Sequence, residues 1–266
     1  MRVLITIAAL VTLVGCETVA TTQPGAVGVE RQQTMMVSSA EIDKAAAQEY
    51  AKVIAAARQK GTLDRNAQHV QRVRTIMNRI VPQVASFRPE ARSWGWEVHV
   101  IQENQLNAWA MPGGKMVVYS GLIEKLQLTD NELAAIMGHE IAHSLREHAR
   151  ERVSREMATG MGLSIAGAVF GLGQVGQELA NMVAQVTFTL PHSRTHEIEA
   201  DRIGVELAAR AGYDPHAAVS LWQKMLQAGG GGGPQFLSTH PSPETRLADL
   251  KVYADRVMPL YQQARR

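Results

Sequence analysis

The stretch His139-Glu140-Ile141-Ala142-His143 sets the interpretation of the whole sequence. On a helix, His139 and His143 lie one turn apart and project from the same face, so both imidazoles can reach one metal ion. Zinc prefers such nitrogen ligands, and a catalytic zinc site keeps one coordination position for water. Glu140 can take a proton from that water, whose pKa zinc lowers to about 7. The pentapeptide therefore predicts a zinc site with Glu140 as general base.

The residues around the pentapeptide predict the helix that carries it. Thr129-x-x-Glu132 is a capping-box pattern, which places a helix start shortly before the first histidine. Leu133, Ile136 and Met137 give the helix an apolar side that would bury the site, and we expect the helix to continue to about Arg152.

A catalytic zinc site needs a third protein ligand. The metzincin extension requires glycine and histidine where this chain has Arg146 and Ala149, which excludes that class. His148 lies nine residues after His139, and at about 100° per residue this spacing places it on the opposite side of a continuous helix. We therefore expect His148 to be a surface residue.

A pair of carboxylates further along the chain offers better candidates. Glu197 and Asp201 are four residues apart and share a helix face, whereas Glu199 points away. One carboxylate of the pair can ligate zinc while the other orients a ligand histidine through its ring N–H. A solvated acidic helix face is the alternative, but small or apolar residues continue the Glu197 side and favour burial, namely Gly204, Leu207 and Ala208.

Three features together resemble one family of gluzincin metallopeptidases. They are the His139–His143 motif, the Glu197-x-Glu199-Ala-Asp201 pattern and Thr239-His240-Pro241. This is the family of the type I CAAX prenyl protease and the HtpX heat-shock protease, and the chain looks nearest its periplasmic lipoprotein branch. The resemblance covers roughly residues 40 to 255.

The resemblance implies a set of roles for these residues. One zinc ion per chain would lie on His139, His143 and Glu197, with Glu140 as general base and Asp201 as a supporting acid. A segment upstream of the motif resembles the edge strand that binds substrate backbone by strand addition, namely Asn107, Ala108, Trp109 and Ala110.

Two residues near the end of the chain have roles that stay open. His240 follows the five-glycine run Gly229–Gly233, which we predict to be a mobile loop, so it could swing toward the metal. It would then stabilise the tetrahedral oxyanion, or occupy the fourth zinc position of a latent enzyme, or merely cap the last helix. Arg246 on that helix would support the oxyanion or pair with a carboxylate.

The first residues predict export. A positive charge at Arg2 precedes an apolar stretch from Val3 to Val14, which is too short for a membrane span of roughly 20 residues. We therefore predict a signal peptide over residues 1–15, with a buried N-terminal strand or helix as the alternative.

The end of this apolar stretch indicates a lipid anchor. Leu13-Val14-Gly15-Cys16 resembles the lipobox of bacterial lipoproteins, and Cys16 is the only cysteine. We predict lipidation of Cys16, a tether over residues 16–38 and a metallopeptidase domain over 39–266. Glu17 after the cysteine suggests, by the same resemblance, a periplasmic protein anchored to the outer membrane, with this lipid as its only membrane contact.

Residues 157–176 are apolar and rich in glycine. Their hydrophobic length is marginal for a membrane span and no aromatic belt flanks them. We therefore favour a mobile flap or helical hairpin beside the active site.

The composition favours helices over sheet. Aromatic residues make up 5% of the chain, so we expect an aliphatic core, and a net charge of +2 without a long basic run argues against nucleic acid. Trp96–Ile101 alternates like a strand, and Asn107–Tyr119 predicts a hairpin around a glycine turn. We expect a mainly helical α+β domain, zincin-like, with a small and partly antiparallel sheet flanking the motif helix.

Local signals also predict where several helices begin and end. Ser38-x-x-Glu41 would begin a helix, Pro82 would kink or end one, and Gly212 would end the helix that carries the carboxylate pair. Ser242-Pro243 would begin the last helix.

These features together predict a zinc-dependent endopeptidase of the bacterial envelope. By family analogy alone, its substrates would be misfolded or stalled envelope and outer-membrane proteins, with outer-membrane assembly machinery as a candidate partner. Two alternatives are an envelope chaperone or assembly factor whose zinc site is latent or structural, and a lipoprotein binding module in which the motif is accidental.

Overall fold

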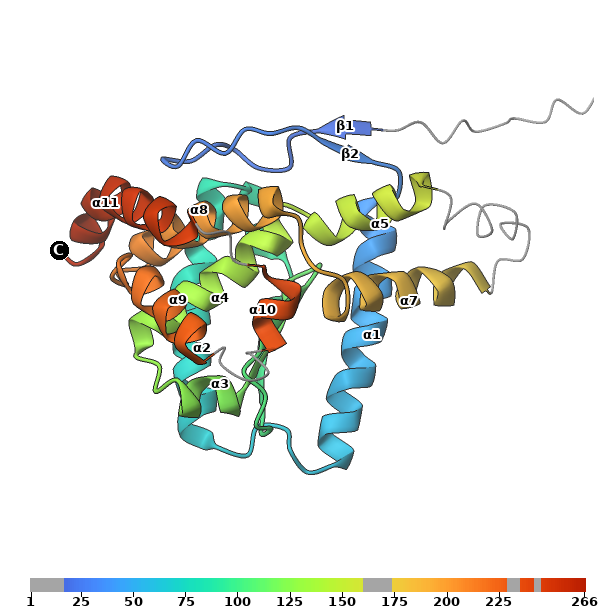
Figure 1. Ribbon diagram of the computed structural model, residues 1–266. Helices are drawn as coiled ribbons and strands as arrows, with labels where there is room; N and C mark the ends of the chain where they lie inside the picture. Colours follow the sequence, from blue (N-terminus) through green and yellow to red (C-terminus); the bar gives the residue numbers. More distant parts are fainter. Residues whose placement is uncertain (1–16, 160–173, 229–234, 242–244) are drawn as a thin grey trace, which may run out of the picture.

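The computed structural model of the chain (Figure 1) describes residues 17–159, 174–228, 235–241 and 245–266. The predicted signal peptide, Cys16, most of the 157–176 stretch, the five-glycine run and Ser242-Pro243 lie outside these residues. Within them, none of the helices combines the length and apolar content that a membrane crossing requires.

Helices dominate the described chain, with short strands between them, which confirms the predicted fold class. In chain order the elements are β1 (Glu17–Val19), β2 (Gln33–Met35), α1 (Ser39–Gln59), α2 (Ala67–Ile80), the 3-10 helices η1 (Val81–Ser86) and η2 (Pro89–Ser93), β3 (Glu97–Ile101), β4 (Ala108–Met111), β5 (Lys115–Tyr119), α3 (Ser120–Lys125), α4 (Asp130–Leu145), α5 (His148–Ala158), α7 (Gln174–Phe188), α8 (Arg194–Arg210), α9 (Ala217–Ala228), α10 (Gln235–Thr239) and α11 (Arg246–Ala264).

The central sheet has the strand order β3-β5-β4. β3 and β5 are parallel, whereas β4 and β5 form the predicted antiparallel hairpin, in which Trp109 lies opposite Val117. The hairpin turns at Gly113 and Gly114, whose φ angles of 78° and 84° favour glycine. β4 is therefore the edge strand on one side of this sheet.

Each face of the sheet contributes to a separate hydrophobic core, because alternate residues of a strand point to opposite faces. Val100, Met116 and Val118 join the core formed with α2, α4, α8, α9 and α11. Trp109 and Val117 join the core formed with α1 and α7. Figure 1 shows α1 and α7 on one side of the molecule and α2, α8, α9 and α11 on the other, with α4 between them.

Two glycines let the helices α4 and α8 cross at close range. A Cβ on Gly138 would lie 2.7 Å from the backbone oxygen of Gly204, and a Cβ on Gly204 would lie 2.7 Å from the backbone nitrogen of His139. Real Cβ atoms do not approach backbone so closely, so both positions need glycine. The crossing sets the distance between the helix with the histidine motif and the helix with the carboxylate pair.

The helix predicted from Thr129 to about Arg152 is wrong in one respect, because it is two helices. The capping box of Thr129 and Glu132 begins α4 as predicted, but α4 ends at Leu145 and α5 begins at His148. Glu147 between them adopts a left-handed conformation with φ 49°. A single left-handed residue redirects the chain, and hydrophobic periodicity does not reveal it.

The N-terminal segment, predicted as a tether over residues 16–38, is folded against the domain in its described part. Val27 and Val29 are buried in the core of α4 and α8, and the backbone N–H of Val27 donates to Glu206 Oε2 at 3.0 Å. β1 and β2 pair antiparallel, and β2 packs against α5. The segment stays attached because its valines are buried and its polar groups have partners.

Several predicted helix boundaries are confirmed. Ser38 and Glu41 form a capping box at the start of α1, α2 ends at Ile80 before Pro82, and Gly212 follows α8 with φ 77°. The described part of the last helix begins later than Ser242, with Thr245 at the N-cap of α11.

Candidate metal centre

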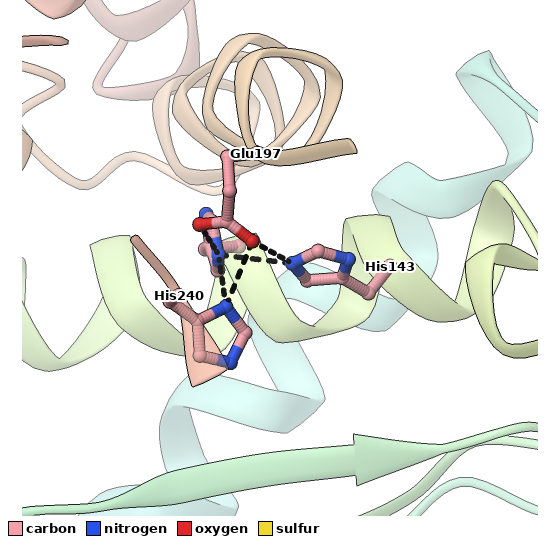
Figure 2. A group of neighbouring side chains, drawn as sticks. His143, Glu197 and His240 are labelled. Carbon is pink, nitrogen blue, oxygen red and sulfur yellow. Dashed lines mark hydrogen bonds and ion pairs between the residues drawn. The ribbon is translucent and has the colours of Figure 1, made fainter. Parts of the chain in front are cut away.

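Four buried side chains converge on one point between α4, α8 and the end of α10 (Figure 2). Ligand atoms of His139, His143, Glu197 and His240 all lie within 4.8 Å of one another. His139 Nε2 lies 3.0 Å from His143 Nε2 and 3.3 Å from His240 Nδ1. Glu197 Oε1 lies 3.0 Å from His240 Nδ1 and 3.4 Å from His143 Nε2.

These separations match the edges of a zinc tetrahedron. Bonds of about 2.0–2.1 Å to the ion place neighbouring ligands of a regular tetrahedron about 3.3–3.4 Å apart. Two motif histidines and one glutamate also form the donor set of a catalytic zinc site. The residues therefore fit zinc, and His240 is close enough to the other three to offer a fourth ligand atom.

Glu140 lies beside this group with one oxygen unused. Its Oε2 accepts a hydrogen bond from the backbone N–H of Ala110 at 3.1 Å. Its Oε1 is buried and has no hydrogen-bond partner among the described residues, although His240 Nε2 lies 3.6 Å away. Burial raises the pKa of Glu140 above its usual value. A buried acceptor without a partner suits a group that receives a proton from a bound molecule.

The second carboxylate of the predicted pair holds the first histidine. Asp201 Oδ1 lies 2.9 Å from His139 Nδ1, which leaves Nε2 of the same ring facing the centre. Arg246 donates to Glu197 Oε2 at 3.0 Å and to Asp201 Oδ1 at 2.6 Å. Of the two roles considered for Arg246, the structure shows carboxylate pairing, and the guanidinium also lies 3.3 Å from the ring centre of Trp222.

The buried charges at the centre stabilise an ionised Glu197. Burial alone would raise its pKa, but His240, His143 and His139 surround the carboxylate and hold the pKa well below its usual value. Burial has the opposite consequence for His143, whose pKa lies well below its usual value. A charged carboxylate and a neutral imidazole are the forms that bind a metal ion.

His240 is held in place from both sides. Its ring stacks on Phe236 at a centroid distance of 4.1 Å and on His192 at 4.8 Å. The backbone N–H of His192 also donates to the carbonyl of Thr239 at 2.7 Å. His192 could not be predicted from periodicity, because it precedes the cap residue Ser193 of α8 in a stretch without a repeating pattern.

His148 is not the surface residue that the helical spacing predicts. It is fully buried, with its Nδ1 2.8 Å from His143 Nδ1 and its Nε2 3.0 Å from Glu199 Oε2. An angle of 100° per residue applies only within a continuous helix. Because Glu147 adopts a left-handed conformation, the chain turns back toward the site before His148. Glu199 does point away from the centre, as predicted, but into this buried cluster.

The predicted substrate strand divides into two parts. Trp109 and Ala110 line a pocket together with Glu140, His143, His192 and His240. Asn107 and Ala108 do not line it, and the carbonyl of Asn107 accepts from the backbone N–H of Tyr119 at 3.1 Å. The part of β4 that lines the pocket is therefore its middle, at Trp109 and Ala110, next to Glu140.

Comparison with known proteins points to one peptidase family. The sequence profile of peptidase family M48 matches residues 67–254, which is more than half of the chain. The mitochondrial metalloendopeptidase OMA1 of Arabidopsis thaliana is 37% identical over 166 residues, which cover 61% of this chain and 33% of that protein. The OMA1 protein of Schizosaccharomyces pombe is 38% identical over 161 residues, which cover 59% of this chain and 46% of that protein.

A bacterial relative matches the same part of the chain. The beta-barrel assembly-enhancing protease of Escherichia coli is 33% identical over 180 residues, which cover 62% of this chain and 36% of that protein. The chain thus spans between about a third and a half of the length of these relatives.

Proposed function

We propose that this chain, which belongs to peptidase family M48, is a zinc-dependent endopeptidase of the bacterial envelope. The observation that carries the proposal is the convergence of ligand atoms of His139, His143, Glu197 and His240 within 4.8 Å of one another, beside a Glu140 oxygen that has no partner among the described residues. A structural zinc site needs four ligands but no adjacent buried base, so this arrangement favours hydrolysis.

Each residue at the centre has a definite task in this proposal. His139, His143 and Glu197 would hold zinc, which when bound lowers the pKa of a water ligand and polarises a carbonyl group. Glu140 receives a proton of the attacking water molecule at Oε1 and passes it to the leaving amine. Asp201 orients His139, and Arg246 holds the carboxylates of Glu197 and Asp201 in place by donating a hydrogen bond to each.

The edge strand β4 would hold the substrate. Its backbone pairs with β5 on one side only within the sheet, and Trp109 and Ala110 line the pocket beside Glu140. An extended peptide that adds to this edge would place a carbonyl group near the centre. Main-chain pairing gives little side-chain selectivity, which suits a protease of unfolded proteins.

Other observations support the envelope location and the substrates. The apolar stretch before Cys16 supports export and lipid anchoring at the outer membrane in the periplasm. The Escherichia coli relative is named a beta-barrel assembly-enhancing protease, which supports a link to the assembly machinery of outer-membrane proteins as a partner. We propose misfolded or stalled envelope and outer-membrane proteins as the substrates. Membrane contact would run through the lipid alone.

The test is casein cleavage by the full-length chain purified in detergent, beside Glu140→Gln. We expect the variant to retain zinc and to lose about 100-fold or more in cleavage rate, because a general base contributes 10²- to 10⁴-fold. A Glu140→Gln variant that cleaves as fast as wild type would contradict the proposed function.

A second candidate is a latent enzyme or an assembly factor with a silent zinc site. The observation that favours it is His240, whose Nδ1 lies 3.3 Å from His139 Nε2 and 3.0 Å from Glu197 Oε1, so that it would compete with a water molecule for the zinc. His240→Ala separates the readings. Faster cleavage with zinc retained indicates latching by His240, slower cleavage indicates a role in catalysis, and no cleavage by either protein indicates a silent site.

A further inference from the structure

A chain of hydrogen bonds leads away from the zinc-facing ring of His143. His143 Nδ1 lies 2.8 Å from His148 Nδ1, and His148 Nε2 lies 3.0 Å from Glu199 Oε2. All three side chains are buried. They come from three helices, α4, α5 and α8, which meet only because the chain turns at Glu147.

The series of hydrogen bonds ends at Glu199, where the direction of donation is fixed. Its Oε2 accepts from Arg146 Nε at 3.0 Å and from Arg31 Nη2 at 3.1 Å, and its Oε1 accepts from Arg31 Nε at 2.6 Å. Both oxygens of this carboxylate accept from guanidinium groups, and a carboxylate bound in this way offers only acceptors for further hydrogen bonds. The proton between Glu199 and His148 therefore lies on His148 Nε2.

This polarity determines the tautomer of the metal ligand. A neutral imidazole that donates through Nε2 accepts through Nδ1, so His148 Nδ1 accepts and His143 Nδ1 must donate. The Nε2 lone pair of His143 is then free and faces His139, Glu197 and His240. The reverse polarity would place a proton on His143 Nε2 and prevent it from binding a metal.

We propose that His148 and Glu199 are positioning residues that hold His143 in its metal-binding tautomer. The inference rests on the zinc site of the proposed function. Each of the two histidine ligands is then oriented by a carboxylate. Asp201 holds His139 directly at 2.9 Å, and Glu199 holds His143 through His148. Such partners of a metal ligand fix its ring orientation and raise its basicity.

The neighbouring histidine offers a matched control. His196 stacks on His148 at a centroid distance of 4.2 Å and an interplanar angle of 15°, and its Nε2 lies 3.2 Å from Glu151 Oε2. His196→Phe keeps a ring in this stack and leaves the bonds of His148 intact. His148→Phe also keeps a ring, but removes both hydrogen bonds. His148→Gln restores an acceptor toward His143 and a donor toward Glu199.

The first measurement uses nitrogen NMR of the full-length, zinc-free protein to identify the protonated ring nitrogen of His143. We expect Nδ1 to carry the proton in wild type and in His196→Phe, and this preference to be lost in His148→Phe. A wild-type His143 that carries its proton on Nε2 would overturn the inference. Because no metal is present, this result does not depend on whether the proposed function is correct.

The second measurement is zinc affinity by competition with a chelator. We expect His148→Phe to bind zinc about 10- to 100-fold more weakly than wild type, His148→Gln to recover most of that loss, and His196→Phe to match wild type. A folded His148→Phe variant with wild-type affinity would refute the positioning role. If His148→Phe does not fold, the tautomer of His143 in the wild-type protein still decides. A wild-type protein without zinc affinity would contradict the proposed function instead, and the NMR result would remain decisive for the tautomer.

Discussion

The close crossing of α4 and α8 makes Gly204→Ala a sharp test of how the fold builds the site. The added Cβ would lie 2.7 Å from the backbone nitrogen of His139 and 2.9 Å from the carbonyl carbon of Gly138. Carbon atoms pack at about 3.5–4.0 Å, so the two helices must separate by roughly 0.7–1 Å. The obstacle is backbone in a buried helix, which cannot rotate out of the way.

The magnitude follows from two opposing terms. Overpacking in a core costs about 1–3 kcal/mol, and the three close contacts with backbone atoms place this case near the upper end. Alanine in a helix interior recovers about 1 kcal/mol over glycine. We therefore expect Gly204→Ala to lower the free energy of unfolding by about 2 kcal/mol, as measured by urea denaturation.

The same displacement should weaken zinc binding, because Glu197 and Asp201 move with α8 while His139 and His143 stay on α4. Metal sites tolerate about 0.2 Å in ligand distance, which is less than the expected shift. Gly176→Ala is the control, since Gly176 is also helical and a Cβ there meets nothing within 4 Å. If Gly204→Ala is as stable as this control and binds zinc with wild-type affinity, the crossing does not set the site geometry.

Three further predictions concern stability. Burial alone would raise the pKa of Glu151, but hydrogen bonds from Arg31 and His196 hold that pKa below its ordinary value of 4.5. The ionised carboxylate of Glu151 therefore stabilises the fold above about pH 5, and this stabilisation is lost as the pH falls through the pKa of the folded state. Urea denaturation should accordingly show a smaller loss of stability between pH 5 and pH 3 in Glu151→Gln than in wild type, and equal losses would refute the assignment. Removal of zinc should lower the free energy of unfolding by about 4 kcal/mol relative to protein at free zinc 1,000 times its Kd, and an unchanged melting temperature after chelation would contradict the metal centre. Thr129→Ala removes the side-chain cap of α4 and should cost about 1 kcal/mol, whereas a change within 0.5 kcal/mol would mean that the cap contributes little.

The part of the site that follows helical periodicity could be predicted from the sequence. His139 and His143 share a face of α4, and Glu197 and Asp201 share a face of α8, because both helices are regular over these residues. Local hydrogen bonding also fixed the start of α4, since a capping box needs only residues three positions apart.

The remaining features depend on tertiary structure that periodicity does not carry. His148 reaches the site because Glu147 adopts a left-handed conformation, which breaks the angular count between residues. His192 lies in a connection before α8, and its place against His240 depends on α10. The N-terminal segment has no periodic pattern, yet Val27 packs in the core because Glu206 accepts its backbone N–H.

The most direct test of the central claim is the position of zinc in a crystal of the full-length chain, measured by anomalous scattering at the zinc absorption edge. The account predicts one peak about 2.0–2.2 Å from His139 Nε2, His143 Nε2 and a carboxylate oxygen of Glu197. A crystal grown with zinc that shows no peak at these three residues would contradict the account.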